Sequence, residues 1–490
     1  GEVDGQPVPR LRPAGPVALE VVDLADLPPA ERRKEARRRG TEIASSPFDL
    51  AEGPLFRAAL LRLAEDDHVL VLAFHRAVAD VESARVFARE LRTLHDAFAA
   101  GRPSPLADPA LRYGDFAAWQ RRWLDDAQDG GSLAWWTEQL AGAPPRLELP
   151  ADFARPAMRG HDLAAVSRRL PRGGADAVHA LAAQHDATPE VVLLAAFQLV
   201  LGAAAGADDV VVGVRATARR PETEALVGPF ANLLPLRARL SGEATFAALL
   251  DQARWTLADA RARQDVPFER VIEELRPERS LSHAPIVQVL FDFDDVRRGR
   301  DDLPVVGDVG GGMELALRVR ETAGGMILTL RYDAGLFAET RIRALLDEYA
   351  RVLGEATADA SLPLSRVAPI VRRERAAEPV AGAEVESVAP RTLTEEVIAS
   401  IVAEVLGTET VGVHDDFFAR GGHSFLATRV LARVATALGV ALPLRRFFET
   451  PTVAGLAAAV DSAGGGEIAR MLDELEGLSD DEIEALLATE

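Results

Sequence analysis

The fold of the C-terminal part of the chain is decided by the stretch DFFARGGHSFLA, residues 416–427. Two glycines precede Ser424, and apolar residues recur at every fourth position over residues 426–438, which predicts a helix that begins at the serine. The glycines permit a turn that keeps the serine hydroxyl exposed to a modifying enzyme. The N–H groups and the dipole at a helix N-terminus favour an attached phosphodiester. The stretch is therefore compatible with attachment of a phosphorylated group, although this pattern alone is more typical of a turn followed by a helix N-cap.

This stretch resembles the core motif of the peptidyl carrier domains of nonribosomal peptide synthetases. The resemblance continues on both sides, over segments similar to the end of the family's first helix, to its loop, and to a later helix with its cap: residues 401–406, 411–416 and 443–453. It implies a small all-α, four-helix carrier domain at residues 392–462.

The resemblance implies that Ser424 carries a 4′-phosphopantetheine arm, with Gly422 and His423 beside the attachment point. The arm would hold an acyl, aminoacyl or peptidyl group as a thioester. Without the flanking matches, two glycines and a serine before a helix would more often be a turn followed by a helix N-cap. The serine does not fit a hydrolase nucleophile elbow, which needs a glycine two residues further on, where Leu426 stands.

Composition excludes several classes of function. The net charge of −21 argues against nucleic-acid binding, which needs clustered Lys and Arg. The absence of cysteine excludes disulfides, thiolate catalysis and cysteine-ligated metals, and no metal site is expected. A chain rich in Ala, Arg, Gly and Pro suggests a GC-rich bacterial genome.

The longest apolar run covers residues 191–207 and is short for a membrane span. Thr188, Pro189 and Glu190 before it are typical of a helix start. The run therefore predicts a buried helix, and no membrane contact is expected. The N-terminus also lacks the pattern of a signal peptide, so a cytoplasmic protein is expected.

The chain divides into four zones. Residues 1–368 alternate strand-like and helix-like stretches, which predicts an α/β domain. Strands are expected at residues 69–74, 210–214, 286–293, 314–319 and 326–332, and helices at 82–98, 114–124, 175–184 and 340–353. A Pro-rich stretch at 146–156 is the expected junction of two lobes, at about 1–150 and 157–368.

The regions around the carrier domain have distinct compositions. Residues 369–391 are rich in Glu, Ala, Pro and Val without periodicity and are interpreted as an interdomain linker. Residues 463–490 form an acidic C-terminal tail, in which a capping box at 479–482 predicts a short amphipathic helix. We interpret this tail as a solvated chain end rather than a docking element.

A histidine marks the first half of the α/β domain. Residues 69–80 form an apolar strand that runs into a loop before the helix expected at 82–98, and His75 lies at the junction. Such a position suits acid–base chemistry. A single histidine, however, is more often structural.

Several further segments together resemble the condensation domain of nonribosomal peptide synthetases. Four segments fit motifs of that family and a fifth fits the strand that follows them: residues 113–120, 209–213 with Arg219, 227–232, 263–269 and 285–291. The resemblance covers almost all of residues 1–368. It implies two chloramphenicol-acetyltransferase-like lobes that form a V, with a tunnel between them that a carrier arm enters from either side.

The sequence departs from this family at its reacting motif, His-His-x-x-x-Asp-Gly. Here the residues are His75, Arg76, three others, Asp80 and Val81, so Arg76 replaces the histidine usually assigned to the reacting amine. Arginine stays protonated at any working pH and cannot accept a proton. Arg215 and Pro229 also differ, where the family usually has a proline and an aromatic residue.

The remaining motif residues are expected to keep structural roles. By resemblance Asp80 should pair with an arginine, for which Arg219 is the candidate, and Asn232 in a neighbouring motif is also assigned a structural role. An N-cap for the following helix is an alternative role for Asp80, and both can hold together. His75, Arg76 and Asp80 are thus the degenerate catalytic motif.

Two further departures concern organisation. The family's opening motifs are not in this sequence, and no adenylation domain separates the large domain from the carrier. The expected partners are therefore a phosphopantetheinyl transferase, an upstream donor carrier and an adenylation domain acting in trans.

Three hypotheses remain open for the large domain. It forms amide bonds slowly or by unusual means, or it is a non-catalytic platform that recruits tailoring enzymes to the carrier. Glycopeptide synthetases contain a condensation-like domain of the second kind with a similar His-Arg motif, although a second Asp usually stands at the position of Val81 and that domain follows its carrier. Thirdly, Arg76 was introduced to inactivate the domain, which would leave Val81 and Arg215 unexplained.

Overall fold

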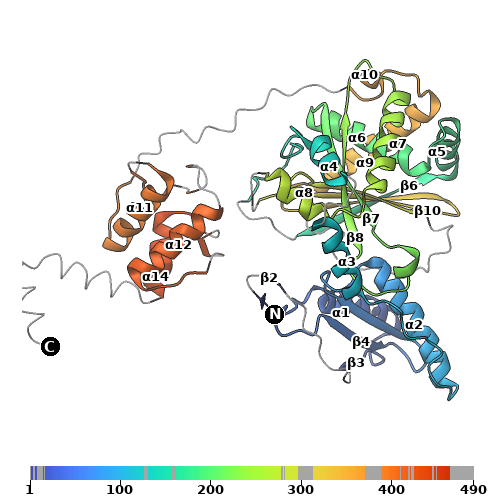
Figure 1. Cartoon of the computed structure of the whole chain (residues 1–490), viewed down its shortest axis with the longest axis horizontal. Coiled ribbons are helices and arrows are strands. Elements are labelled where there is room, and N and C mark those ends of the chain that lie inside the picture. The colour runs from blue at the N-terminus through green and yellow to red at the C-terminus, as the bar shows by residue number, and fades with distance from the viewer. Residues whose placement is uncertain are drawn as a thin grey trace, which may run out of the picture.

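The computed structural model describes residues 2–3, 6–7, 15, 17–125, 131–156, 162–277, 280, 282–295, 313–369, 388–408, 410–415, 417, 420, 424–443, 446–447 and 450–463, and all structural statements concern these residues. Within them lie a two-lobed α/β domain and a small helical domain (Figure 1). A short pair of strands, β1 (Glu2–Val3) and β2 (Gln6–Pro7), precedes the lobes.

The smaller lobe is built on a three-stranded sheet in the order β3-β4-β5. Its strands are β3 (Leu19–Asp23), β4 (Phe56–Arg62) and β5 (His68–Phe74), with β3 parallel and β5 antiparallel to β4. Helix α1 (Pro29–Ser45) packs on one face around a core that includes Leu24, Ala36, Leu61 and Leu63. Helix α2 (Val81–Ala99) follows β5. The strand expected at 69–74 and the helix expected at 82–98 are confirmed.

The larger lobe is built on a six-stranded sheet in the order β6-β11-β10-β9-β7-β8. The strands are β6 (Leu163–Pro171), β7 (Asp209–Thr217), β8 (Ala231–Arg239), β9 (Val289–Asp295), β10 (Leu315–Thr322) and β11 (Gly325–Asp333). Strand β9 runs parallel to both β7 and β10, and the other pairs are antiparallel.

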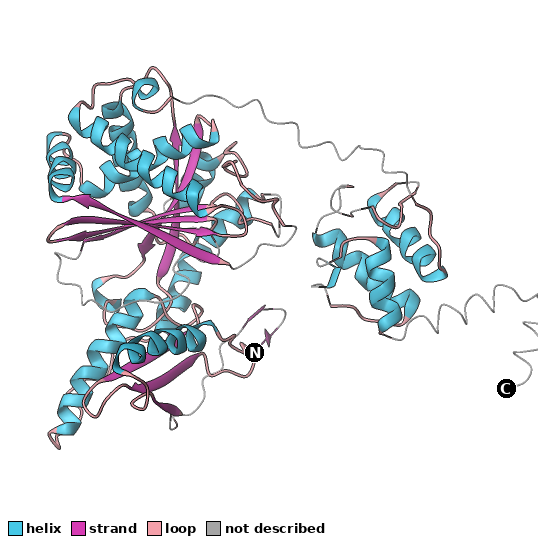
Figure 2. Cartoon of the chain, turned by 180° about the vertical axis from the view of Figure 1, so that it is seen from behind, coloured by secondary structure: helices cyan, strands magenta, loops and turns pink. Residues whose placement is uncertain are grey.

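Helices cover one face of this sheet, as Figure 2 shows. They are α5 (Arg172–Gln184), α6 (Pro189–Ala205), α7 (Phe246–Ala262) and α9 (Glu339–Ala358), and α8 (Phe268–Leu275) lies near the end of β8. A turn of 3₁₀ helix at Pro221–Thr223 and the short helix α10 (Leu364–Val367) complete the lobe.

Helix α6 explains the long apolar run. Thirteen of its residues are buried, because it lies between the sheet and the neighbouring helices. The expected buried helix is therefore confirmed. Among the described residues no single helix is long and apolar enough to cross a membrane; α5 and α6 meet that length and composition only together, with a 103° bend between them.

The chain enters the larger lobe earlier than the Pro-rich stretch predicts. Helix α4 (Ser132–Leu140) already places Trp136 and Leu140 in the core of the larger lobe, and Leu147 is buried there too. The side chain of Gln288 accepts a hydrogen bond from the Leu147 N–H (2.9 Å). The Pro-rich segment thus lies against the larger lobe, and the boundary near residue 150 is placed too late.

Helix α3 (Tyr113–Asp125) bridges the two lobes, and it confirms the helix expected at 114–124. Its Phe116 packs with Ala218, Leu226 and Phe230, which belong to the segment between β7 and β8. One expected strand differs in its start: β9 begins at Val289 rather than at 286, because Ile286 has a φ of 64°, which interrupts extended backbone.

The small domain has a core of its own. Helices α11 (Leu393–Leu406), α12 (Ser424–Leu438) and α14 (Val453–Ser462) pack together around Ile398, Val430 and Leu456, among others. Residues 443–453, where another helix is expected, are described only in part. Most of the linker and the acidic tail lie outside the described residues.

Candidate functional site

A buried polar cluster fixes the start of α2, and we call Asp80, Ser83 and Arg219 the Asp80 cluster. Asp80 caps the helix, because its Oδ1 accepts a hydrogen bond from the backbone N–H of Ser83 (2.7 Å). Arg219 Nη2 donates to the same carboxylate oxygen (3.0 Å), and the two side chains are only 4% and 7% exposed. Both roles expected for Asp80 are thus present.

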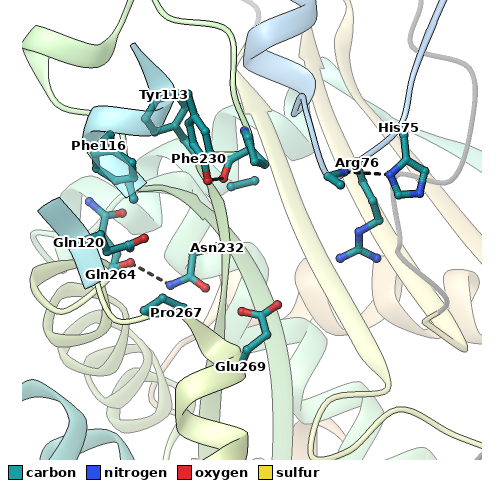
Figure 3. A pocket seen from close by; sticks show the side chains of 14 residues that line it. His75, Arg76, Tyr113, Phe116, Gln120, Phe230, Asn232, Gln264, Pro267 and Glu269 are labelled. Atoms are coloured by element: carbon teal, nitrogen blue, oxygen red, sulfur yellow. Dashed lines mark hydrogen bonds between the residues drawn. The ribbon is translucent and has the colours of Figure 1, made fainter. Parts of the chain in front are cut away.

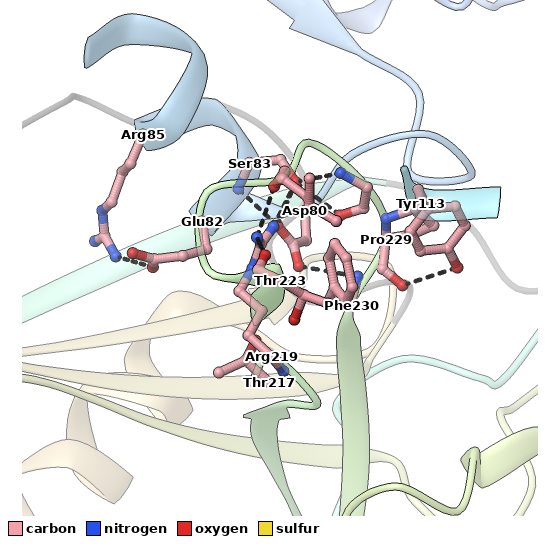
Figure 4. Close-up of polar contacts among 12 residues, drawn as sticks. Asp80, Glu82, Ser83, Arg85, Tyr113, Thr217, Arg219, Thr223, Pro229 and Phe230 are labelled. Carbon is pink, nitrogen blue, oxygen red and sulfur yellow. Dashed lines mark hydrogen bonds and ion pairs between the residues drawn. The ribbon is translucent and has the colours of Figure 1, made fainter. Parts of the chain in front are cut away.

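Polar and aromatic neighbours hold the Arg219 guanidinium in place (Figure 4). It donates to Ser83 Oγ (2.8 Å) and to the carbonyl oxygen of Leu226 (2.6 Å), and it lies 4.3 Å from the centre of the Phe230 ring. Because a buried charge is costly unless it is paired and hydrogen-bonded, these contacts stabilise the cluster.

The cluster also ties the two lobes together. Ser83 Oγ accepts from the N–H of Gly228 (2.9 Å) and lies 2.7 Å from its carbonyl oxygen, and Asp80 Oδ2 accepts from the N–H of Phe230 (3.1 Å). A Cβ at Gly228 would lie 2.2 Å from Tyr113, so only glycine fits this close approach. The segment between β7 and β8 is therefore fixed against α2.

His75 makes contacts typical of a structural histidine. Its backbone N–H donates to the carbonyl oxygen of Leu55 (3.0 Å), and its Nδ1 accepts from the N–H of Ala77 (3.1 Å). The ring lies edge-on to Phe48, with 5.9 Å between the ring centres. The Nδ1 atom of His75 is therefore already used in a hydrogen bond within the turn.

Arg76 lies next to His75 but faces a different environment. Its side chain is exposed and lines a cavity of about 460 Å³ between the two lobes (Figure 3). No hydrogen bond or ion pair joins it to another described residue. Because a guanidinium cannot accept a proton, the position that the family uses for a histidine holds a permanent cation here.

Both lobes contribute to the cavity wall. Tyr113, Phe116 and Phe230 supply aromatic surface, and Gln120 and Asn232 supply amides. Burial, and to a lesser degree the charge of Asp80, raises the pKa of the Tyr113 phenol, which therefore stays neutral. Gln264, Pro229 and Glu269 also line the cavity.

Asn232 holds the backbone of the turn before α8. Its Nδ2 donates to the carbonyl oxygens of Gln264 (2.8 Å) and Val266 (2.7 Å), and its Oδ1 accepts from the N–H of Phe268 (3.0 Å). Gln120 Nε2 donates to the carbonyl oxygen of Asp265 (2.9 Å). Both amides thus hold the turn before α8 and position Glu269 on its first turn.

Arg215 lies on the large sheet, in a cross-strand row with Asp292 and Arg318. Both arginines donate to Asp292 Oδ2 at 2.9 Å. Burial opposes ionisation of Asp292, but the two arginines outweigh it and hold its pKa below the ordinary value. Of the two further departures from the family pattern, Arg215 therefore forms an ion pair on the sheet. The other, Pro229, lines the cavity.

The carrier site is described only in part. Ser424 is the first residue of α12, as predicted, whereas Gly422 and His423 lie outside the described residues. Upstream, Asp415 Oδ2 accepts from the N–H of Gly412 (2.6 Å) and pairs with Arg420 (2.7 Å). Within the described part of the chain no group of three His, Asp or Glu side chains could hold a metal ion.

Sequence reasoning found His75, Arg76, Asp80, Arg219 and Asn232, and the structure brings the regions around them together at the lobe boundary. It did not single out Glu269 or the glutamines at 120 and 264 as cavity residues. The sequence did contain a signal for these three residues, because they lie in the family-like segments 113–120 and 263–269.

Comparison with known proteins gives two family matches and several relatives. Residues 2–377 match the condensation-domain family, and residues 396–460 match the phosphopantetheine attachment site family. A protein of the linear gramicidin synthase of Brevibacillus parabrevis is 37% identical over 382 residues, an alignment that covers 76% of this chain and 5% of that protein. Phosphinothricin tripeptide synthetase PhsC of Streptomyces viridochromogenes is 40% identical over 298 residues, covering 61% of this chain and 27% of that protein.

Solved structures share the fold. The X-domain from teicoplanin biosynthesis is 28% identical with a TM-score of 0.67, and the match covers 73% of this chain and 82% of that one. The complex of the X-domain and OxyB from teicoplanin biosynthesis matches at 28% identity with a TM-score of 0.66. That match covers 74% of this chain and 82% of the other chain. The first condensation domain of the calcium-dependent antibiotic synthetase, at 22% identity and a TM-score of 0.57, covers 72% and 78% and supports the fold alone.

The two-lobed fold and these matches define the class: the chain belongs to the condensation-domain family and carries a phosphopantetheine-attachment domain. Its gramicidin and phosphinothricin relatives are components of peptide synthetases, and it spans only 5% of the length of the former.

Proposed function

We propose that the chain is a condensation–carrier segment of a nonribosomal peptide synthetase. In this proposal the domain at 1–368 forms amide bonds between carrier-bound groups, and 369–391 links it to the carrier at 392–462, followed by the tail at 463–490. The observation that carries the proposal is the pairing of a condensation-family match at 2–377 with an attachment-site match at 396–460 in one chain.

We assign the phosphopantetheine arm to Ser424. The serine begins a 15-residue helix, so its backbone N–H is one of the unpaired donors at a helix N-terminus, which suits an attached phosphodiester. Gly422 and His423 precede it and would adjoin the arm. When attached, the arm would present an acyl group as a thioester that an amine can attack.

Arg76 determines how well the domain catalyses. In amide formation a C–N bond forms while the C–S bond of the thioester breaks, and the ammonium proton passes to the leaving thiolate or to solvent. Arg76 cannot take that proton, although it can donate hydrogen bonds to a carbonyl oxygen. An α-amino group has a pKa of about 7.7–8.0, so some of it is neutral without a base. We expect turnover about 10²–10⁴-fold below that of a domain with a histidine base.

A second candidate is a non-catalytic platform that recruits tailoring enzymes to the carrier. It is favoured by one observation, the likeness to the teicoplanin X-domain, which also has a structure in complex with OxyB. Arg76 suits such a role, because the platform needs no base. Val81, where that class usually has an acidic residue, does not favour it.

The proposed partners follow from the chemistry. A phosphopantetheinyl transferase would modify Ser424, and an upstream carrier would supply the donor. An adenylation domain acting in trans would load the carrier, because residues 369–391 are too few to form one.

Intact-protein mass spectrometry tests this proposal. The full chain is treated with an aminoacyl-coenzyme A and a promiscuous phosphopantetheinyl transferase, then mixed with a donor-loaded carrier, beside a Ser424→Ala control. We expect the aminoacyl arm to add only when Ser424 is present, and the donor group to transfer slowly onto it. Loading of the Ser424→Ala chain would contradict the attachment site. Loading without any transfer would favour the platform.

A further inference from the structure

Two opposite charges face the cavity between the lobes. Arg76 comes from the loop after β5 in the smaller lobe, and Glu269 from the first turn of α8 in the larger lobe. Figure 3 shows the Arg76 guanidinium and the Glu269 carboxylate projecting toward the same region of the cavity from different elements. Neither side chain has a hydrogen-bond or ion-pair partner within the described part of the chain. The cavity therefore presents a cation and an anion that no described residue neutralises.

The neighbouring charges are already paired. Asp80 is taken by Arg219, and Arg220 pairs with Asp265 at 2.7 Å. On α8 itself Arg270 pairs with Glu273, also at 2.7 Å. Arg76 and Glu269 thus differ from the charged residues around them, because they remain available to a ligand.

We propose that this cavity binds a group that carries both a carboxylate and an ammonium, with the carboxylate at Arg76 and the ammonium at Glu269. A guanidinium binds a carboxylate through two parallel, charge-assisted hydrogen bonds, which adds direction to the attraction. The aromatic wall of Tyr113, Phe116 and Phe230 excludes part of the water and strengthens both interactions.

The inference rests on the proposed function and names its substrate class. The acceptor amine reaches the site as an ammonium, which Glu269 would bind, and it loses its proton to solvent before the neutral amine attacks the thioester. The carboxylate has two possible sources: an acidic side chain on an arm-bound aminoacyl group, such as aspartyl, or the α-carboxylate of a free amino acid. The shared chemistry is a small dipolar ion.

Stable pantetheine amides test the proposal on the full chain before its own arm is attached, with dissociation constants measured by calorimetry. The probes are aspartyl-pantetheine amide, its neutral match asparaginyl-pantetheine amide, and the N-acetyl-aspartyl form, which lacks the ammonium. We expect the aspartyl probe to bind about tenfold or more tightly than either match, because each match lacks one of the two charge-assisted interactions.

Two variants test the two charges separately, and a third variant is the control. Arg76→Gln should remove the preference for aspartyl over asparaginyl, and Glu269→Gln should remove the preference for the free amine over its N-acetyl form. Arg270→Gln, one residue along α8 and outside the cavity lining, is the matched control and should leave all three affinities unchanged. Free L-aspartate and L-asparagine are tested as competitors of the aspartyl probe. Competition at low concentration identifies the α-carboxylate of a free amino acid as the source.

Several results would overturn the inference. Equal binding of the aspartyl and asparaginyl probes, with condensation still observed on Ser424, rejects the substrate class and leaves the proposed function standing. Failure of every pantetheine probe to bind, together with no transfer onto loaded Ser424, contradicts both the substrate class and the proposed function. If Arg76→Gln weakens the aspartyl and asparaginyl probes equally, then Arg76 does not bind the substrate carboxylate and that assignment is wrong.

Discussion

Asp80 and Arg76 lie in the same loop, yet their surroundings are opposite. Asp80 is buried, caps α2 and pairs with Arg219, and its bond to the N–H of Phe230 joins the two lobes. Arg76 is exposed, has no partner among the described residues and faces a cavity. The part of the motif that builds the fold matches the family pattern here, whereas the part that faces the cavity differs from it. The two parts of the motif are therefore physically separate: Asp80 supports the fold, and Arg76 faces the cavity.

The largest expected effect on stability comes from Asp80→Asn. The change leaves the Arg219 charge buried without its partner, so we expect the free energy of unfolding to fall by about 3–5 kcal/mol. All five tryptophans lie in residues 1–368, so fluorescence during urea unfolding reports on this domain. Asp67→Asn is the matched control, because its pair with Arg33 is exposed and should contribute about 0–1 kcal/mol. Equal losses of unfolding free energy in Asp80→Asn and Asp67→Asn would contradict the distinction between the buried and the exposed ion pair.

A smaller, pH-dependent effect is expected from Asp292→Asn. The variant leaves Arg215 and Arg318 facing each other without the carboxylate, which should cost about 1–3 kcal/mol at neutral pH because the site is only partly buried. The folded-state pKa of Asp292 is held below its ordinary value, so the stabilisation is present above the unfolded pKa of about 3.9 and is lost as the pH falls through the folded value. The difference between the two proteins should therefore shrink below about pH 4. A difference that stays constant from about pH 7 to pH 3 would contradict this account.

The smallest effect on stability is expected at Arg76 itself. Arg76→Gln removes no described contact, so the free energy of unfolding should stay within about 0.5 kcal/mol of the original. The same urea titration measures it. A loss comparable to that of Asp80→Asn would mean that Arg76 supports the fold, and the two-part description of the motif would fail.

The sequence predicts those parts of the fold whose residues have a strong pattern. The apolar run that becomes α6 and the strands β7, β10 and β11 fall where expected, because they are continuous or alternating apolar stretches bounded by turn residues. Strand β8 was not expected, since Pro235 stands in its middle; the sheet tolerates it because β8 is an edge strand. Strand β6 was missed too, because its Ala- and Arg-rich sequence has little β propensity.

The candidate site was predicted only where a motif names it. Asp80, Arg219 and Asn232 could be named from the sequence because each lies in a family-like motif, and the structure shows Asp80 paired with Arg219 and Asn232 bonded to the backbone of Gln264. Glu269 is far from Arg76 along the chain, and only the packing of the two lobes brings it to the same cavity. No local pattern specifies which long side chains will face a cavity between lobes, so this pairing required the structure.

The most direct test of the central claim compares the original chain with Arg76→His in a single-turnover condensation assay. Both chains carry an aminoacyl arm on Ser424, react with the same donor-loaded carrier, and are followed by intact-protein mass. If Arg76 occupies the position of the base, the histidine variant should condense about 10²–10⁴-fold faster. Equal rates, or a faster original chain, would show that amide formation does not depend on a base at this position.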